Sequence, residues 1–179
     1  MQKIYISLVR TGSPVGKFVA KMMKDDVTHA AIALDRNLDT LHSFGRVSEW
    51  NPIIGGFRKE TYRTGYYSRM KDLPGVVMEM DVTDNQYALA TRIIKTFIRN
   101  KNQYRYSFAK LISNLFGIEV QDDGFICSEF VAYVLQEAGV VSFSAPLSLV
   151  RPQVLFRELL RCRAVPIYVG DMKRYRMAV

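Results

Sequence analysis

Two patterns of apolar and polar positions recur along the chain. Runs that are rich in apolar, aromatic or β-branched residues, the first of them alternating with polar positions, predict strands. They cover residues 3–9, 27–35, 40–45, 75–83 and 163–170. Stretches in which apolar residues recur every three or four positions predict helices. They cover residues 15–26, 85–100, 108–117, 127–139 and 152–162. Because strands and helices do not alternate strictly, we expect one α+β domain over residues 1–179, with a mainly antiparallel sheet.

Residues 47–74 fit neither pattern. They contain Trp50, a pair of glycines and several tyrosines. A connection of this length without regular structure is often functional. We therefore predict a long loop here and interpret it as a flap over a site.

Two of the predicted strands form a hairpin. The sequence RNLD (36–39) lies between them and predicts a turn. We expect a hairpin about the turn at 36–38 to bring His29 and His42 roughly level on neighbouring strands, where side chains on one face are about 5 Å apart. One histidine would then orient the ring of the other. Since the sequence does not fix the register, Ser43 on the opposite face remains an alternative.

A cysteine begins the helix predicted at 127–139, in the stretch GFICSEFVAYVL. The same helical face carries Val131, Val134 and Ala138, so it should pack on the sheet. Cysteine is among the most buried residue types, which allows an inert core thiol. A thiol at a helix N-terminus, however, lies beside unpaired N–H groups and the positive end of the helix dipole. Both favour a thiolate, and the same N–H groups can stabilise an oxyanion.

The composition limits the other functional classes. The net charge is +8, which suits contact with an anionic surface. The basic residues are dispersed and no nucleic-acid-binding motif accompanies them, so we expect no specific nucleic-acid partner. With two cysteines, two histidines and no CxxC pair, we expect no metal site and no cofactor. The sequence lacks a signal peptide and a long apolar run, which predicts a cytoplasmic protein, and it gives no indication of oligomeric state.

Four stretches of the chain together resemble a known family. They are THAAIAL (28–34), LHSFG (41–45), YRYS (104–107) and FICSEFVAYVLQEAG (125–139). They resemble the circularly permuted papain-like fold of the NlpC superfamily of cysteine hydrolases. This permuted group includes YiiX/YebB-like proteins and lecithin:retinol acyltransferase-like proteins. In this group the histidine strand precedes the cysteine helix, which is the order found here.

The resemblance implies a role for each candidate residue. Cys127 would be the nucleophile, His29 the base and His42 the third, polar member of a triad. Tyr104 or Tyr106 would serve the oxyanion site. The sheet would pack against the helix that carries the nucleophile.

We therefore predict a thiol hydrolase or acyltransferase that acts on amide or ester bonds without a cofactor. The resemblance implies a small peptide, a cell-wall fragment or a lipid-like fatty-acyl substrate. The alternative is a basic, non-enzymatic binding module for anionic lipid or nucleic acid, in which Cys127 is buried and inert. Selective modification of Cys127 by a thiol reagent would separate the two hypotheses.

Overall fold

A computed structural model describes residues 1–12, 25–46, 55–65 and 67–178. Six strands form one sheet in the order β4-β3-β2-β1-β5-β6, and every neighbouring pair is antiparallel. The strands are β1 (Gln2–Val9), β2 (His29–Ala33), β3 (Leu41–Arg46), β4 (Gly55–Glu60), β5 (Pro74–Val82) and β6 (Val165–Asp171). The predicted α+β class with an antiparallel sheet is confirmed.

The described residues also form four α-helices. They are α2 (Asp84–Arg99), α3 (Phe108–Leu115), α4 (Cys127–Glu137) and α5 (Pro152–Arg161). Helix α2 begins with a capping box, in which Thr83 and Gln86 exchange side-chain and backbone hydrogen bonds. Pro152 occupies the first turn of α5, where its missing N–H costs nothing. Cys127 is the first residue of α4, as the apolar pattern predicted.

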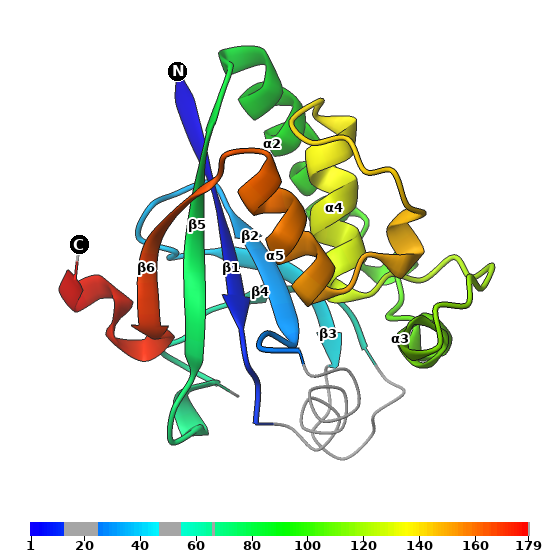
Figure 1. The fold of residues 1–179 in the computed structure, drawn as a ribbon, viewed down its shortest axis with the longest axis horizontal. Coiled ribbons are helices and arrows are strands. Elements are labelled where there is room, and N and C mark those ends of the chain that lie inside the picture. The colour runs from blue at the N-terminus through cyan, green and yellow to red at the C-terminus, as the bar shows by residue number, and fades with distance from the viewer. Residues whose placement is uncertain (13–24, 47–54, 66, 179) are drawn as a thin grey trace.

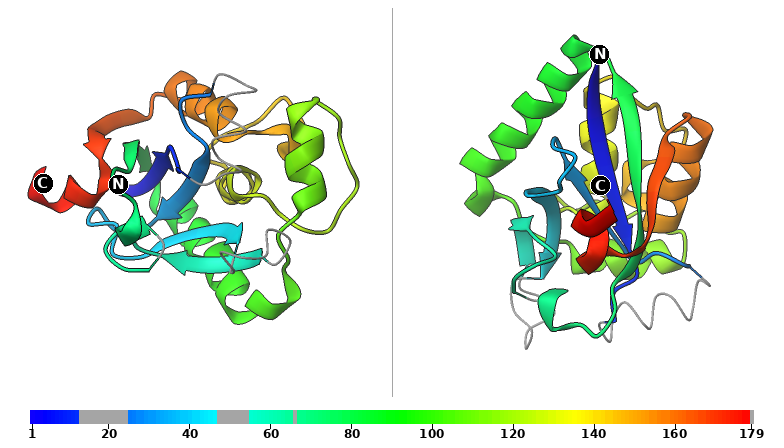
Figure 2. Two further views of the ribbon diagram at one scale, coloured as in Figure 1. Left: turned by 90° about the horizontal axis from the view of Figure 1, so that it is seen from below. Right: turned by 90° about the vertical axis from the view of Figure 1, so that its left-hand side faces the viewer.

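Helices α2, α4 and α5 lie against one face of the sheet (Figures 1 and 2). Between the layers lies the main core, in which the largest fully buried side chains come from both layers. They include Ile4, Ile6, Leu8, Ile32, Phe44, Phe130, Leu135, Leu155 and Leu159. The described helices include none with the length and apolar content needed to cross a bilayer. Burial of the apolar face of α4 in this core fixes the helix, and with it Cys127, on the sheet.

The opposite face of the sheet is also covered. A second buried cluster lies there, formed by strand residues together with side chains from residues 62–73 and the C-terminal segment. Its members include Tyr62, Tyr67, Leu73, Met172 and Tyr175. Because both faces are buried, polar side chains within the sheet need partners inside the protein.

The structure changes two of the predictions made from the sequence. The segment 47–74 is not a structureless loop, since strand β4 and the short 3-10 helix η1 (Tyr67–Arg69) lie within it. The sequence GGFRKE of β4 escaped prediction because it lacks an apolar alternation. Among the strands of the described residues, β4 pairs with β3, and Gly56 also forms an isolated bridge with Arg105, so β4 lies at the sheet's edge. The helix predicted at 15–26 falls mostly outside the described residues, and residues 25 and 26 are not helical.

Candidate active site

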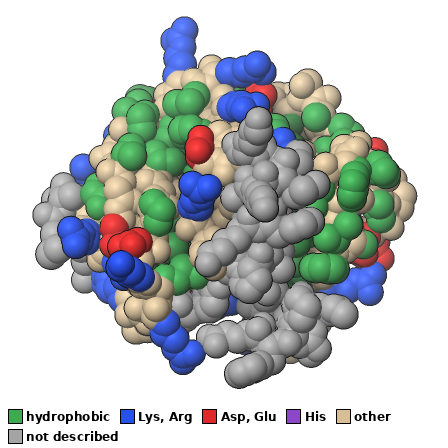
Figure 3. All heavy atoms as spheres, turned by 60° about the horizontal axis from the view of Figure 1, so that its bottom comes forward, with side chains coloured by type: hydrophobic (Ala, Val, Ile, Leu, Met, Phe, Trp, Pro, Cys, Tyr) green, Lys and Arg blue, Asp and Glu red, His purple; other side chains and the backbone are tan. Residues whose placement is uncertain are grey.

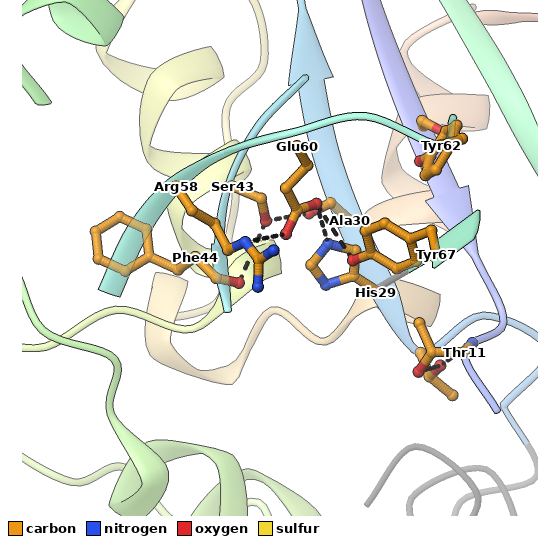
Figure 4. A network of polar contacts seen from close by, with 11 residues as sticks. Thr11, His29, Ala30, Ser43, Phe44, Arg58, Glu60, Tyr62 and Tyr67 are labelled. Atoms are coloured by element: carbon orange, nitrogen blue, oxygen red, sulfur yellow. Dashed lines mark hydrogen bonds and ion pairs between the residues drawn. The ribbon is translucent and has the colours of Figure 1, made fainter. Parts of the chain in front are cut away.

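A histidine and a carboxylate form the centre of the candidate site. His29 is the first residue of β2 and Glu60 the last residue of β4. The Nε2 atom of His29 lies 2.8 Å from Oε2 of Glu60, and both side chains are buried. Glu60 also forms an ion pair with Arg58, whose Nε lies 3.3 Å from Oε1. Figure 4 shows Glu60 between Arg58 and His29. The carboxylate is thus placed to hold the imidazole ring and to favour its charged form.

The thiol of Cys127 meets this pair from the other layer. It is 7% exposed, and its pKa is lowered by the His29 side chain and by the backbone of Ala30. Because Nε2 of His29 is directed at Glu60, Nδ1 is the ring nitrogen left for the sulfur. Cys127, His29 and Glu60 therefore form a continuous chain of interacting groups.

The electrostatics favour an ion pair within this chain. Burial lowers the pKa of His29, but the Glu60 carboxylate and the Cys127 thiolate outweigh burial and raise it to about 10. Burial raises the pKa of the Cys127 thiol, but the charge and hydrogen bond of His29 and the Ala30 hydrogen bond lower it below its ordinary value. Opposite charges in a buried site stabilise each other. The two groups therefore stabilise each other's charged forms, which favours a thiolate–imidazolium pair over the neutral pair.

The predicted register of the hairpin was wrong. Strands β2 and β3 do pair antiparallel, but His42 lies opposite Ile32 and not opposite His29. The turn itself lies where it was predicted: the pairing of Ile32 with His42 centres it on residue 37, where Asp35 accepts the N–H groups of Leu38 and Asp39 and Leu38 takes a positive φ of 54°. A turn with this centre places residue 29 level with residue 45, three positions beyond His42. An odd shift in register moves a side chain to the other face of a sheet.

His42 consequently lies away from the ring it was expected to orient. Its pKa is lowered to about 4 by burial and by the nearby charge of Lys59, so it is neutral at pH 7. Its ring meets the edge of Phe57, with the centroids 5.9 Å apart. Ser43, the alternative, donates its hydroxyl to the Ala30 carbonyl at 2.6 Å. The group that contacts His29 in the place of the third triad member is Glu60, which sequence reasoning missed.

The two tyrosines assigned to the oxyanion site have partners in the main core. The ring of Tyr104 stacks on Phe97, with the centroids 4.3 Å apart. Tyr106 donates its N–H to Gly55, and its side chain packs against the main core. The tyrosine hydroxyl that lies at the His29–Glu60 pair is that of Tyr67, which donates to Oε2 of Glu60 at 3.3 Å. An oxyanion role for Tyr104 or Tyr106 stays a prediction.

A buried ion pair fixes the segment that leads into α4. Lys110 donates to Glu129 and to the carbonyl of Gly124, both at 2.8 Å. The second oxygen of Glu129 accepts the N–H of Ile126, at 3.2 Å. These bonds tie α3 to the first turn of α4, and so they fix the N-terminus of the helix that begins with Cys127.

The second cysteine and the described acidic side chains suggest no further chemistry for the site. Cys162 is an exposed free thiol, and Cys127 is a buried one. The described residues contain no group of three or more His, Cys, Asp or Glu side chains that could hold a metal ion. Figure 3 shows the molecule with the bottom of Figure 1 brought forward, and on this face Lys and Arg side chains are dispersed among apolar ones.

Comparison with known proteins adds no identification. No protein-family model matches this chain, and no curated protein sequence matches it. The assignment of a function therefore depends on the geometry and electrostatics of Cys127, His29 and Glu60.

Proposed function

We propose that the protein is a thiol hydrolase that cleaves amide or ester bonds through Cys127, His29 and Glu60. The observation that carries this proposal is the buried chain from Glu60 through His29 to Cys127, with its 2.8 Å hydrogen bond and oppositely shifted pKa values. Buried groups whose pKa values are shifted in opposite directions by each other's charge are typical of activated nucleophiles. The resemblance to permuted papain-like hydrolases supports the same assignment, including the fold.

The first half of the reaction follows from the ion pair. The Cys127 thiolate attacks the substrate carbonyl carbon, and its electron pair forms the new carbon–sulfur bond. The carbonyl π electrons move to oxygen, where the N–H groups in the first turn of α4 can stabilise the oxyanion. The His29 imidazolium then gives its proton to the departing amine or alcohol as the oxyanion collapses. The product of this half is a thioester on Cys127.

The second half regenerates the enzyme. Neutral His29 removes a proton from water, and the resulting hydroxide attacks the thioester carbonyl. Collapse releases a carboxylic acid and returns the thiolate and the imidazolium. Glu60 stabilises the imidazolium that is present before the thiolate attacks and that forms again when His29 takes a proton from water. If an alcohol or amine replaced the water, the same steps would give acyl transfer.

The test is selective alkylation of the two thiols. Iodoacetamide at pH 7 should modify Cys127 faster than the exposed Cys162, although Cys127 is buried. His29→Ala should slow labelling of Cys127 and leave Cys162 unchanged, since the imidazolium that stabilises the thiolate is lost. Mass spectrometry of the two tryptic peptides measures both rates in one sample. Equally slow labelling of the two thiols would contradict the proposal and favour the binding-module alternative.

A generic acyl substrate supplies the second readout. With p-nitrophenyl acetate, the wild-type protein should release a stoichiometric burst of nitrophenolate as Cys127 is acylated. Cys127→Ala should abolish the burst, while Cys162→Ala should not change it. A burst that survives in Cys127→Ala would exclude this cysteine as the nucleophile.

A further inference from the structure

The hydrogen-bond ladder between β2 and β3 is interrupted beside the thiol. The described residues of the two strands pair at Ile32 and His42. In an antiparallel ladder, the next pair that exchanges hydrogen bonds lies two residues along each strand, here Ala30 and Phe44. The Ser43 hydroxyl occupies this place: it donates to the Ala30 carbonyl at 2.6 Å and lies 3.3 Å from the Phe44 carbonyl (Figure 4).

The interruption leaves one backbone N–H of β2 directed into the space between β2 and β3. The N–H and C=O of a strand residue point toward the same neighbouring strand. The Ala30 carbonyl meets Ser43 of β3, so the Ala30 N–H points toward β3 as well. There it faces the Cys127 thiol, whose pKa is lowered by the Ala30 backbone. The thiol thus takes the place of a strand partner for this one amide.

We propose that Ser43 is a positioning residue, which holds β2 and β3 apart so that the Ala30 N–H is available to the Cys127 thiolate. The inference rests on the proposed function, because the amide stabilises the thiolate needed for attack. Ser43 is fully buried, and its hydroxyl supplies the donor that the Ala30 carbonyl loses when the ladder opens. Without this hydroxyl, closing the ladder would satisfy that carbonyl and would draw the Ala30 N–H toward Phe44.

The decisive comparison is Ser43→Ala against Ser43→Thr. The quantity measured is the pH midpoint of Cys127 alkylation by iodoacetamide. Ser43→Ala should raise this midpoint by about one to two pH units, the equivalent of one hydrogen bond to a charged group. Ser43→Thr keeps a hydroxyl and should restore the wild-type midpoint. Ser7→Ala is the matched control, since Ser7 is also fully buried in the sheet but bonds to Tyr62 and Met172.

A second measurement needs no variant of Ser43. In the wild-type protein, the amide proton resonance of Ala30 should move with the same pH midpoint as Cys127 alkylation, because its acceptor changes charge. Cys127→Ala should abolish this movement. An unchanged midpoint in Ser43→Ala, or an Ala30 amide that ignores the thiol, would overturn the inference while the proposed function stands. The proposed function itself fails if wild-type Cys127 reacts no faster than Cys162, whatever Ser43 does.

Discussion

Replacing Glu60 by glutamine tests the electrostatic centre of the site. The substitution keeps the size of the side chain and a hydrogen-bonding oxygen, but it removes the charge 2.8 Å from His29. The rise in the pKa of His29 from 6.5 to about 10 corresponds to about 5 kcal/mol in favour of the imidazolium. Glu60 is the largest favourable contribution to this rise. We therefore expect the variant to lower the pKa of His29.

The size of the decrease can be bracketed. A hydrogen bond to a charged group contributes about 1.5–3 kcal/mol, and two charges about 4 Å apart near a protein surface interact by about 4 kcal/mol. These values predict that the pKa of His29 falls by about one to three units in Glu60→Gln. Proton NMR can follow the titration directly, because the chain has only two histidines.

The two histidines should titrate far apart in the wild-type protein. The pKa of His29 is raised to about 10, and that of His42 is lowered to about 4. Glu79→Gln is the matched control, since Glu79 is a strand carboxylate paired with Lys3. A His29 midpoint that stays near 10 in Glu60→Gln would refute the assignment of Glu60 as its partner.

The same variant predicts a pH-dependent loss of stability. The pKa of His29 in the folded protein lies above its unfolded value of 6.5. Its stabilising contribution is therefore complete below pH 6.5 and is lost as the pH rises toward 10. Glu60→Gln should lower the free energy of unfolding by about 1–4 kcal/mol at pH 6, and by less near pH 10. Urea unfolding at the two pH values measures the difference, and an equal loss at both would contradict the linkage.

Three further variants test the surroundings of the site. His42→Leu should leave the alkylation rate of Cys127 unchanged, and it should not lower the free energy of unfolding, because His42 is neutral. A large loss of rate would show that His42 is the third member of the triad. Lys110→Met leaves Glu129 buried without its cation, so it should lower the free energy of unfolding by about 3–5 kcal/mol in urea. Adding Glu129→Gln should recover part of this loss, and no recovery would refute a charge effect. Gly124→Ala would bring a Cβ within 2.8 Å of an Asp122 oxygen and 2.9 Å of the Arg105 carbonyl oxygen. We therefore expect the free energy of unfolding to fall by about 1–3 kcal/mol, with a lower Tm. An unchanged Tm would show that this segment can shift.

The sequence pattern predicted the elements that carry an apolar periodicity. The strands β1, β2, β3, β5 and β6 and the helices α2 to α5 follow from it. Most of them bury apolar side chains in the two clusters, whereas no residue of β6 is buried. Cys127 was found for the same reason, since it begins a helix whose stripe is part of the core. Strand β4 was missed because an edge strand needs no apolar alternation, and its residues GGFRKE include three charged side chains.

The candidate site was harder to predict because its partners are distant in sequence. Glu60 lies in a charged stretch, between Lys59 and Thr61, which gives no local sign that its carboxylate is 3% exposed. Its burial follows from the pairing of β4 with β3 and from the cover that Tyr62 and Tyr67 provide. His42 was chosen instead because it was placed level with His29, although a turn centred on residue 37 pairs His42 with Ile32. The register differs from the predicted one by three residues, and the residue types of these short strands do not record such a difference.

The site joins the two sides of the sheet, and this explains both its stability and its chemistry. Helix α4 brings Cys127 from one face, while Glu60 and Tyr67 belong to the layer on the other. They meet at His29, where β2 and β3 separate. Along this path the charges alternate in sign, from Arg58 to Glu60, to His29 and to the thiolate of Cys127. Each buried charge therefore has an opposite neighbour, which offsets the cost of removing it from water. The series ends in the layer of α4 at Cys127, so in the proposed reaction its sulfur is the group that attacks the carbonyl carbon.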